Sequence, residues 1–196
     1  MGRPLLISNE DLLAVAREVF VRDGAAGSTR EIASKAGISE AALFQRFSTK
    51  PALFLAAMAP PPVDAAAIAT AARAQPGARE GLMIIAELTL AYFREALPVI
   101  LPVVTHPSIG LEALLGHLGR NPAMRLSQVA EDFLAEQHAA GAMTVADPRA
   151  AAAMLVAAMH SIALFEIMGL HGGDMPTAGV RGLVDSLWNG LAPGAG

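Results

Sequence analysis

The chain has 196 residues, of which 54% are hydrophobic and 16% are charged, with a formal net charge of −4 and no cysteine. This composition is typical of a folded protein and excludes an intrinsically disordered chain. The missing cysteine excludes disulfide bonds, a thiolate nucleophile and a cysteine-ligated zinc site.

The charge is distributed unevenly along the chain. Residues 1–55 carry seven basic and six acidic residues, whereas residues 56–196 carry seven basic and twelve acidic ones. A small DNA-reading head on an acidic body would give this asymmetry, and so would other arrangements. No secretory core follows the start, and the uncharged run over residues 150–165 is shorter than the ~20 residues of a membrane span. We therefore expect a soluble, cytoplasmic protein with no membrane partner.

Nearly every segment is predicted to be helical, because alanine, leucine and methionine dominate and no sustained alternation of β-branched residues occurs. Residues 8–23 predict an amphipathic helix that is capped by Ser8 or Asn9 and ends at Gly24. The fold class expected from this pattern is all-α.

Residues 28–50 predict two short helices that meet at a tight corner. Ser28 begins the first helix in a capping box with Glu31. Gly37 takes the left-handed conformation that ends it, and Ser39 caps the second helix. Two short helices joined through a glycine and supported by a third form a helix-turn-helix, whose second helix fits the major groove of DNA.

The second helix of this motif is expected to present five side chains outward: Glu40, Ala41, Phe44, Gln45 and Arg46. Gln45 can form two hydrogen bonds with adenine, and Arg46 can bind guanine or a phosphate. Ala41 is small enough to permit close approach to DNA. Lys50 begins the next helix, where it can bind a phosphate together with the free N–H groups.

A proline run at residues 60–62 ends the helix that begins at Lys50 and predicts a domain boundary. We expect a DNA-binding domain over residues 1–58 and a helical domain over 63–196. Pro98 is among the residues expected to end helices in the second domain. Its helices are predicted at roughly 64–75, 78–96, 109–118, 122–140, 148–170 and 177–191.

The segment REIASKAGISEAALFQRFSTKPALF, residues 30–54, resembles the N-terminal domain of the TetR family of bacterial transcriptional regulators. The resemblance covers about residues 9–58. It rests on Arg-Glu-Ile-Ala at 30–33, Ala-Gly-Ile-Ser at 36–39, Leu-Phe-Gln-Arg-Phe at 43–47 and Thr-Lys at 49–50.

The resemblance implies a homodimer that binds a near-palindromic DNA operator. It further implies that Thr29 and Arg30 contact phosphates, that Ser39 begins the reading helix and that Lys50 is a phosphate anchor. Gly2-Arg3-Pro4 resembles the basic arm that often precedes this domain, so Arg3 joins the predicted DNA-binding residues.

Three departures from the family pattern stand out. Phe44 replaces the usual tyrosine and removes a hydroxyl that could bind phosphate. Ala41-Ala42 replaces the common Gly-Thr and removes another. The triple proline interrupts what is usually a longer connecting helix, which puts the usual relay between the domains in doubt.

The resemblance also implies that the second domain dimerises through its last two helices. Residues 148–170 are apolar nearly all round, so this helix is either fully buried or pressed against a partner. Spacing alone favours ordinary core packing, and the resemblance favours an interface. The expected interface residues are Leu155, Ile162, Val180, Leu183, Leu187 and Trp188.

A pocket for a small apolar effector is expected among helices 78–96, 122–140 and 148–170, because methionine and aromatic side chains form adaptable apolar cavities. Core packing explains each candidate as well. Glu166 either orients a polar group of the ligand or reaches solvent. The candidates are Met83, Tyr92, Phe93, Phe133, Met159, His160, Phe165 and Glu166.

No motif for catalysis or cofactor binding occurs: GxGxxG, GxxxxGK[ST], HExxH and GxSxG are all missing. No two histidines lie three or four residues apart, and HGGD at residues 171–174 is explained as a turn. We predict no enzyme activity, cofactor or metal. The favoured function is a repressor released by a small apolar ligand, and the alternative is a helical ligand-binding or protein-interaction module.

Overall fold

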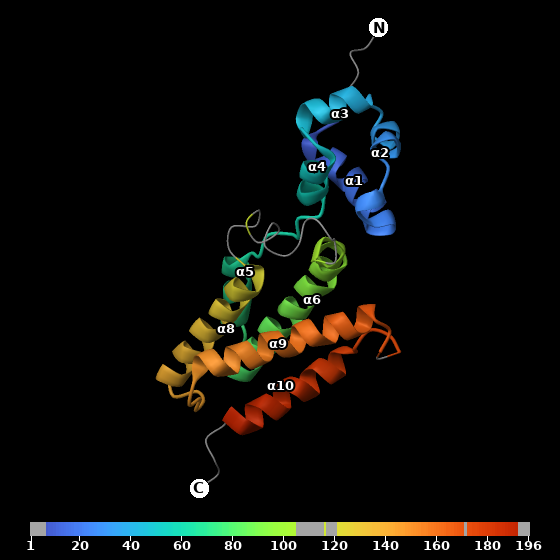
Figure 1. Ribbon diagram of the computed structural model, residues 1–196. Helices are drawn as coiled ribbons and strands as arrows, with labels where there is room; N and C mark the ends of the chain where they lie inside the picture. Colours follow the sequence, from blue (N-terminus) through green and yellow to red (C-terminus); the bar gives the residue numbers. More distant parts are fainter. Residues whose placement is uncertain (1–6, 105–115, 117–120, 171, 192–196) are drawn as a thin grey trace. The chain divides into compact units, whose positions relative to one another are not determined.

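The structure is a computed structural model that describes residues 7–104, 116, 121–170 and 172–191. Over these residues the secondary structure is helical and contains no strand, which confirms the all-α class (Figure 1). The elements are α1 (Asn9–Asp23), η1 (Gly24–Ala26), α2 (Thr29–Lys35), α3 (Glu40–Arg46), α4 (Lys50–Ala57), α5 (Ala65–Arg73), α6 (Ala78–Val104), α8 (Pro122–Ala139), α9 (Pro148–Ile167) and α10 (Thr177–Leu191).

The chain divides into two compact units. Unit 1 consists of Met1–Pro60 and Pro98–Gly119, and unit 2 consists of Pro61–Leu97 and Arg120–Gly196. The first change of unit falls in the proline run, where the sequence predicts a boundary. The predicted helix over 109–118 lies outside the described residues.

The prediction that Pro98 ends a helix is wrong, because α6 runs through Pro98 and Pro102 to Val104. A proline inside a helix removes one backbone hydrogen bond and strains the preceding turn. Val99 and Val103 are 3% and 0% exposed and belong to the core of unit 1. Burial of their side chains offsets the cost of the two prolines.

The core of unit 1 lies between α1 and α4. Phe20 and Phe54 meet edge to face, with ring centroids 5.0 Å apart. Arg17 of α1 donates from Nε to the carbonyl of Ala57 at 2.7 Å and from Nη2 to that of Ala59 at 3.0 Å. These bonds satisfy the last carbonyl of α4 and a carbonyl just after it, neither of which has a partner within the helix.

In unit 2, α6 approaches α5 and α8 closely at Gly81. A Cβ on Gly81 would lie 2.9 Å from the carbonyl oxygen of Ala72 and 2.9 Å from Cε2 of Phe133. Both distances are shorter than a van der Waals contact, so the missing side chain is what permits this packing.

Gly81→Ala is therefore expected to destabilise unit 2 by about 1–3 kcal/mol, the usual cost of overpacking a core. Gly182→Ala is the control, since nothing lies within 4 Å of the Cβ that it would add to α10. Alanine there should stabilise the helix by up to about 1 kcal/mol. Urea unfolding measures both effects, and equal changes in the two variants would contradict the packing argument.

Among the described helices, α9 alone is long and apolar enough to cross a membrane, with a mean hydropathy of 1.8 over its most apolar window. Seven of its residues are buried inside unit 2, including Leu155, Met159 and Ile162.

Candidate functional site

The corner between α2 and α3 is fixed by local hydrogen bonds. The Oγ of Ser28 accepts from the N–H of Glu31 at 3.3 Å, and the Oγ of Ser39 accepts from the N–H of Ala42 at 3.1 Å. Gly37 has a φ of 67°, which a residue with a side chain rarely adopts. These caps and the glycine turn determine the angle at which α3 leaves the corner.

The outer face of α3 is exposed along most of its length. Glu40, Ala41, Phe44 and Gln45 are all exposed, with Phe44 at 36%. Leu43, on the opposite face, is 0% exposed and packs in the core of unit 1. The helix therefore buries one side and presents a surface with one amide, one aromatic ring and one carboxylate.

Arg46, at the end of α3, has a partner within the chain. Its Nη1 donates to the carbonyl of Ile7 at 2.7 Å and to Oδ1 of Asn9 at 3.4 Å. The carbonyl of Ile7 precedes α1, so it lacks a helical partner. The sequence predicts an outward Arg46 that can bind guanine or a phosphate, whereas its Nη1 connects α3 to the start of α1.

Besides Arg17 and Arg46, which bind backbone carbonyls, the described basic residues of unit 1 fall into two groups. Arg22 binds Asp23 and Glu31 at 2.5 and 2.9 Å, and Lys35 lies 3.6 Å from Glu31. Hydrogen bonds from Arg22 lower the pKa of Asp23 and of Glu31, so both carboxylates stay ionised and keep this cation paired.

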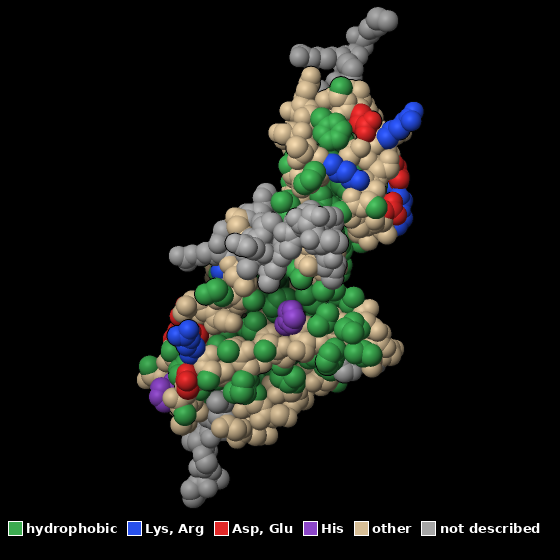
Figure 2. Space-filling model, viewed as in Figure 1, with side chains coloured by type: hydrophobic (Ala, Val, Ile, Leu, Met, Phe, Trp, Pro, Cys, Tyr) green, Lys and Arg blue, Asp and Glu red, His purple; other side chains and the backbone are tan. Residues whose placement is uncertain are grey.

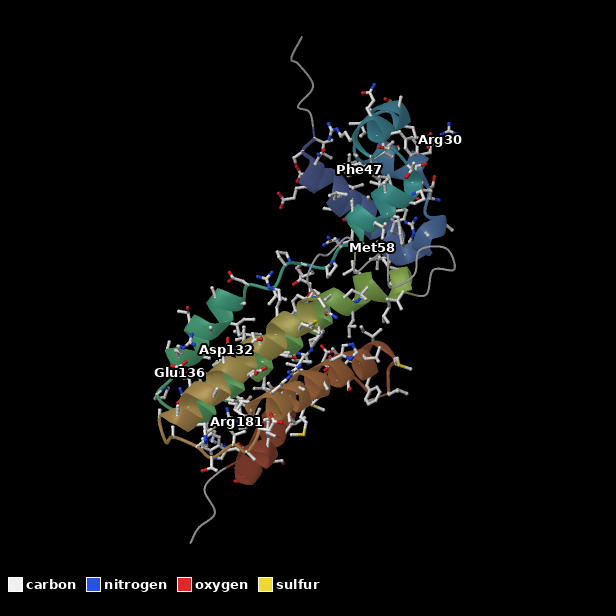
Figure 3. The ribbon with its side chains drawn as sticks, turned by 60° about the vertical axis from the view of Figure 1, so that its left-hand side comes forward. Arg30, Phe47, Met58, Asp132, Glu136 and Arg181 are labelled. Atoms are coloured by element: carbon white, nitrogen blue, oxygen red, sulfur yellow. The ribbon has the colours of Figure 1, made fainter. Side chains whose placement is uncertain are left out.

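Arg30 and Lys50 form the second group, with no ion pair among the described residues. Arg30 is exposed and points away from the helices of unit 1 (Figure 3). Lys50 is the first residue of α4 and is partly exposed. Their charges are available for phosphate oxygens, which is the role that the sequence predicts for both. Arg3 lies outside the described residues.

Thr29 and Glu40 connect the beginnings of α2 and α3. The hydroxyl of Thr29 donates to Oε1 of Glu40 at 2.5 Å. Both residues are predicted DNA contacts, and the carboxylate places a negative charge on the same surface. A carboxylate at a base edge can accept a hydrogen bond from the amino group of cytosine, and it repels phosphate. Glu40 therefore favours one defined position of the protein on the DNA over non-specific binding.

The structure brings together three of the predicted ligand-binding residues. The rings of Tyr92 and Phe93 are 5.5 Å apart, and those of Phe93 and His160 are 5.0 Å apart. Met159 is fully buried beside His160 in the sequence. These residues come from α6 and α9 of unit 2, where Phe93 and Met159 are buried and Tyr92 and His160 are partly exposed.

The remaining ligand candidates lie elsewhere. Met83 lines a surface pocket of about 200 Å³ between α6 and α10, whose other walls include Arg79, Arg181 and Asp185. Phe133 is 3% exposed and packs against Gly81, whereas Phe165 is 38% exposed near the end of α9.

The Glu166 side chain does not reach solvent, so that expectation is wrong, and its ligand-binding role stays a prediction. Its two carboxylate oxygens accept from Arg94 at 2.8 and 2.9 Å, and Oε1 also accepts from the N–H of Met175 at 2.6 Å. The Glu166 side chain is only 5% exposed. Its hydrogen bond raises the pKa of Arg94, and the pair ties α6 to the connection between α9 and α10.

Half of the predicted interface residues are buried within the single chain. Leu155, Ile162 and Val180 are 1%, 6% and 2% exposed, so they have no surface left for a partner, and their assignment to an interface is corrected. Leu183, Leu187 and Trp188 are partly exposed.

Near the end of α9 lies an exposed apolar patch that is not among the predicted interface residues. Its residues are exposed by 38–61%. The nearly uniform apolar character of α9 was the available signal, but it does not tell which face is covered. The patch consists of Phe165, Ile167, Met168 and Leu170.

The part of the chain that the structure describes contains no group of three or more histidine, aspartate or glutamate residues that could bind a metal ion. No curated protein matches the chain. Residues 12–57 match the model of a family of bacterial regulatory proteins, the TetR family.

Several solved structures share the fold at low sequence identity. NalD of Pseudomonas aeruginosa, the secondary repressor of the MexAB-OprM multidrug efflux pump, is 16% identical with a TM-score of 0.66, over 94% of this chain and 96% of NalD. FadR of Bacillus subtilis in complex with stearoyl-CoA is 14% identical with a TM-score of 0.64, over 96% and 100%. PfmR of Thermus thermophilus, a TetR family regulator, is 19% identical with a TM-score of 0.65, over 96% and 99%.

Proposed function

We propose that the chain is a homodimeric repressor of the TetR family, whose N-terminal family model matches residues 12–57. In this proposal α3 enters the major groove of a near-palindromic operator, and a small apolar effector releases the protein from DNA. The observation that carries the proposal is the exposed row Glu40, Ala41, Phe44 and Gln45 on a helix anchored by buried Leu43.

The proposal divides the DNA contacts between two roles. Gln45 reads a base, because its amide can donate to and accept from adenine at the same time. Arg30, Lys50 and the hydroxyl of Ser39 bind phosphates and fix the register of the protein on the duplex. Arg46 positions α3 through its bond to the Ile7 carbonyl.

TetR-family regulators bind operator DNA and small molecules, and they act as dimers. For this chain we propose that the dimer face combines the apolar patch near the end of α9 with the partly exposed residues of α10. An isologous interface pairs each patch with its own copy, so the two α3 helices are related by a two-fold axis. The face consists of Phe165, Ile167, Met168, Leu170, Leu183, Leu187 and Trp188.

Release of DNA requires that the effector bind one spacing of the two α3 helices more tightly than the other. A coupling free energy of about 1–3 kcal/mol lowers operator affinity by roughly 5- to 150-fold. The proposed place of action is the cytoplasm, where the protein meets its operator.

Selection of bound duplexes from random DNA tests the function. The expected result is an inverted repeat whose half-sites lie about one helical turn apart, or a multiple of it. Gln45→Ala should relax the preference at one position in each half-site, because discrimination worth about 1–3 kcal/mol is lost there. Gln128→Ala, the same change on the exposed surface of α8, is the control and should select the wild-type sequence.

Two outcomes would contradict the proposal. The wild-type protein enriches no sequence, in which case unit 1 does not read DNA. Alternatively, Gln45→Ala selects the same bases as the wild type, in which case another residue of α3 is the reader.

A further inference from the structure

Within the described part of the chain, two hydroxyl groups of α6 are buried in unit 2 without a hydrogen-bond partner. Thr89 is 0% exposed, and neither its Oγ1 nor the Oη of Tyr92 has a partner among the described residues. Buried polar groups without a partner are rare because their lost hydration is not compensated. Residues three apart lie on the same side of a helix, so the two hydroxyls belong to one region of the bundle.

The surroundings of these hydroxyls are aromatic and reach the surface. Tyr92 meets Phe93 edge to face, and Phe93 meets His160 of α9 at an interplanar angle of 90°. Tyr92 and His160 are partly exposed, whereas Phe93 is 4% exposed. Hydrophobic side chains gather on the face of unit 2 that carries α9 (Figure 2). A ligand that enters here would find apolar walls and two hydroxyl donors.

The charges nearby restrict the kind of ligand. Arg94 is the nearest cation along α6, and it already binds both oxygens of Glu166 and the carbonyl of Met175. Burial, with a smaller contribution from Glu95, raises the pKa of Tyr92 to about 12, so this hydroxyl stays a neutral donor. The same burial and negative charge disfavour a carboxylate on the ligand. A neutral oxygen meets no such penalty.

We propose that Thr89 and Tyr92 bind the neutral carbonyl or hydroxyl oxygen of a mostly apolar molecule, whose apolar part packs on Phe93 and His160. The identification of this molecule as the effector that releases DNA rests on the proposed function. Binding at the two hydroxyls is a separate claim.

The first test uses the ligand-free protein. Thr89→Val should melt at the wild-type temperature or above it, because the variant removes an unpaired hydroxyl and keeps the shape of the side chain. Thr70→Val, at an exposed position on α5, is the control and should not change the melting temperature. If Thr89→Val lowers the melting temperature by more than about 4 °C relative to Thr70→Val, the hydroxyl has a partner and the proposal is overturned.

The second test compares methyl ketones of five to eleven carbons with the carboxylates of equal length, by calorimetric titration of the full chain. At least one ketone should bind, and its carboxylate should bind at least five-fold more weakly. Thr89→Val and Tyr92→Phe should each weaken the ketone about five-fold, the loss of one neutral hydrogen bond. No binding by any ketone, tighter binding by the carboxylate, or unchanged binding by both variants would each overturn the proposal.

A parallel measurement of operator binding keeps the two proposals apart. If a ketone binds through the two hydroxyls but leaves the affinity for the selected DNA unchanged, the site stands and the release mechanism fails. If the chain binds its selected DNA but no ketone, the regulator stands and the site fails.

Discussion

Lys50→Ala is expected to weaken operator binding about tenfold at physiological salt, by nearly the same factor on every DNA sequence. Lys50 begins α4 and has no ion pair among the described residues, so its ammonium group can neutralise one phosphate. Tenfold corresponds to ~1.4 kcal/mol, the low end for a hydrogen bond to a charged group. The plot of log K against log salt concentration should become shallower by about 1. Fluorescence anisotropy over a salt series measures both quantities.

Lys35→Ala removes the same charge from the same unit and is the matched control. Lys35 lies 3.8 Å from Glu18 and 3.6 Å from Glu31, so its charge is already balanced within the protein. Its loss should change affinity less than twofold, because a charge that two carboxylates already balance attracts a phosphate only weakly. Equal losses in the two variants would show that affinity follows net charge alone, and Lys50 would not be an anchor.

Arg94→Ala is expected to be the most destabilising change in unit 2, at about 3 kcal/mol. The substitution leaves the carboxylate of Glu166, whose side chain is 5% exposed, without its cation. Removal of one partner from a buried ion pair lowers the free energy of unfolding by roughly 3–5 kcal/mol. The low end of this range applies because the Arg94 side chain is 37% exposed, so water can replace part of its role. Trp188, the single tryptophan, lies in unit 2 and reports its urea unfolding by fluorescence.

Two further variants make this prediction specific. Arg73→Ala breaks a pair in which both side chains are 47% exposed, so it should cost less than about 1 kcal/mol. Arg94→Met combined with Glu166→Leu should recover most of the stability, since apolar side chains can replace a buried ion pair. If the double variant is as unstable as Arg94→Ala, the loss comes from packing and not from the unpaired charge.

The elements of unit 1 could be predicted from the sequence because their signals are local. Ser28 and Ser39 lie three residues before the N–H groups that they accept from, and Gly37 provides the turn between the helices. Helix starts and glycine turns depend on neighbours within one turn of chain. For the same reason the outward face of α3, opposite Leu43, follows from helical spacing.

The contacts that the sequence did not predict are distant along the chain. Arg46 meets Ile7 across 39 positions, and Arg94 meets Glu166 across 72. The sequence shows that a charged residue is present, but it does not show which distant residue pairs with it. Likewise Pro98 has a strong local preference to end a helix, and only packing of Val99 in unit 1 overrides it.

The contact between Arg46 and the Ile7 carbonyl affects how many sites in a genome the protein can recognise. Because Nη1 of this guanidinium is bound to the Ile7 carbonyl, Gln45 is the exposed side chain of α3 that can make two hydrogen bonds to a base. Each correctly read pair adds about 1–3 kcal/mol of discrimination, while ~10⁶ or more competing positions dilute the protein. A half-site with so little information content is degenerate. We therefore expect the protein to occupy a family of related promoters whose shared element is the symmetry of the repeat.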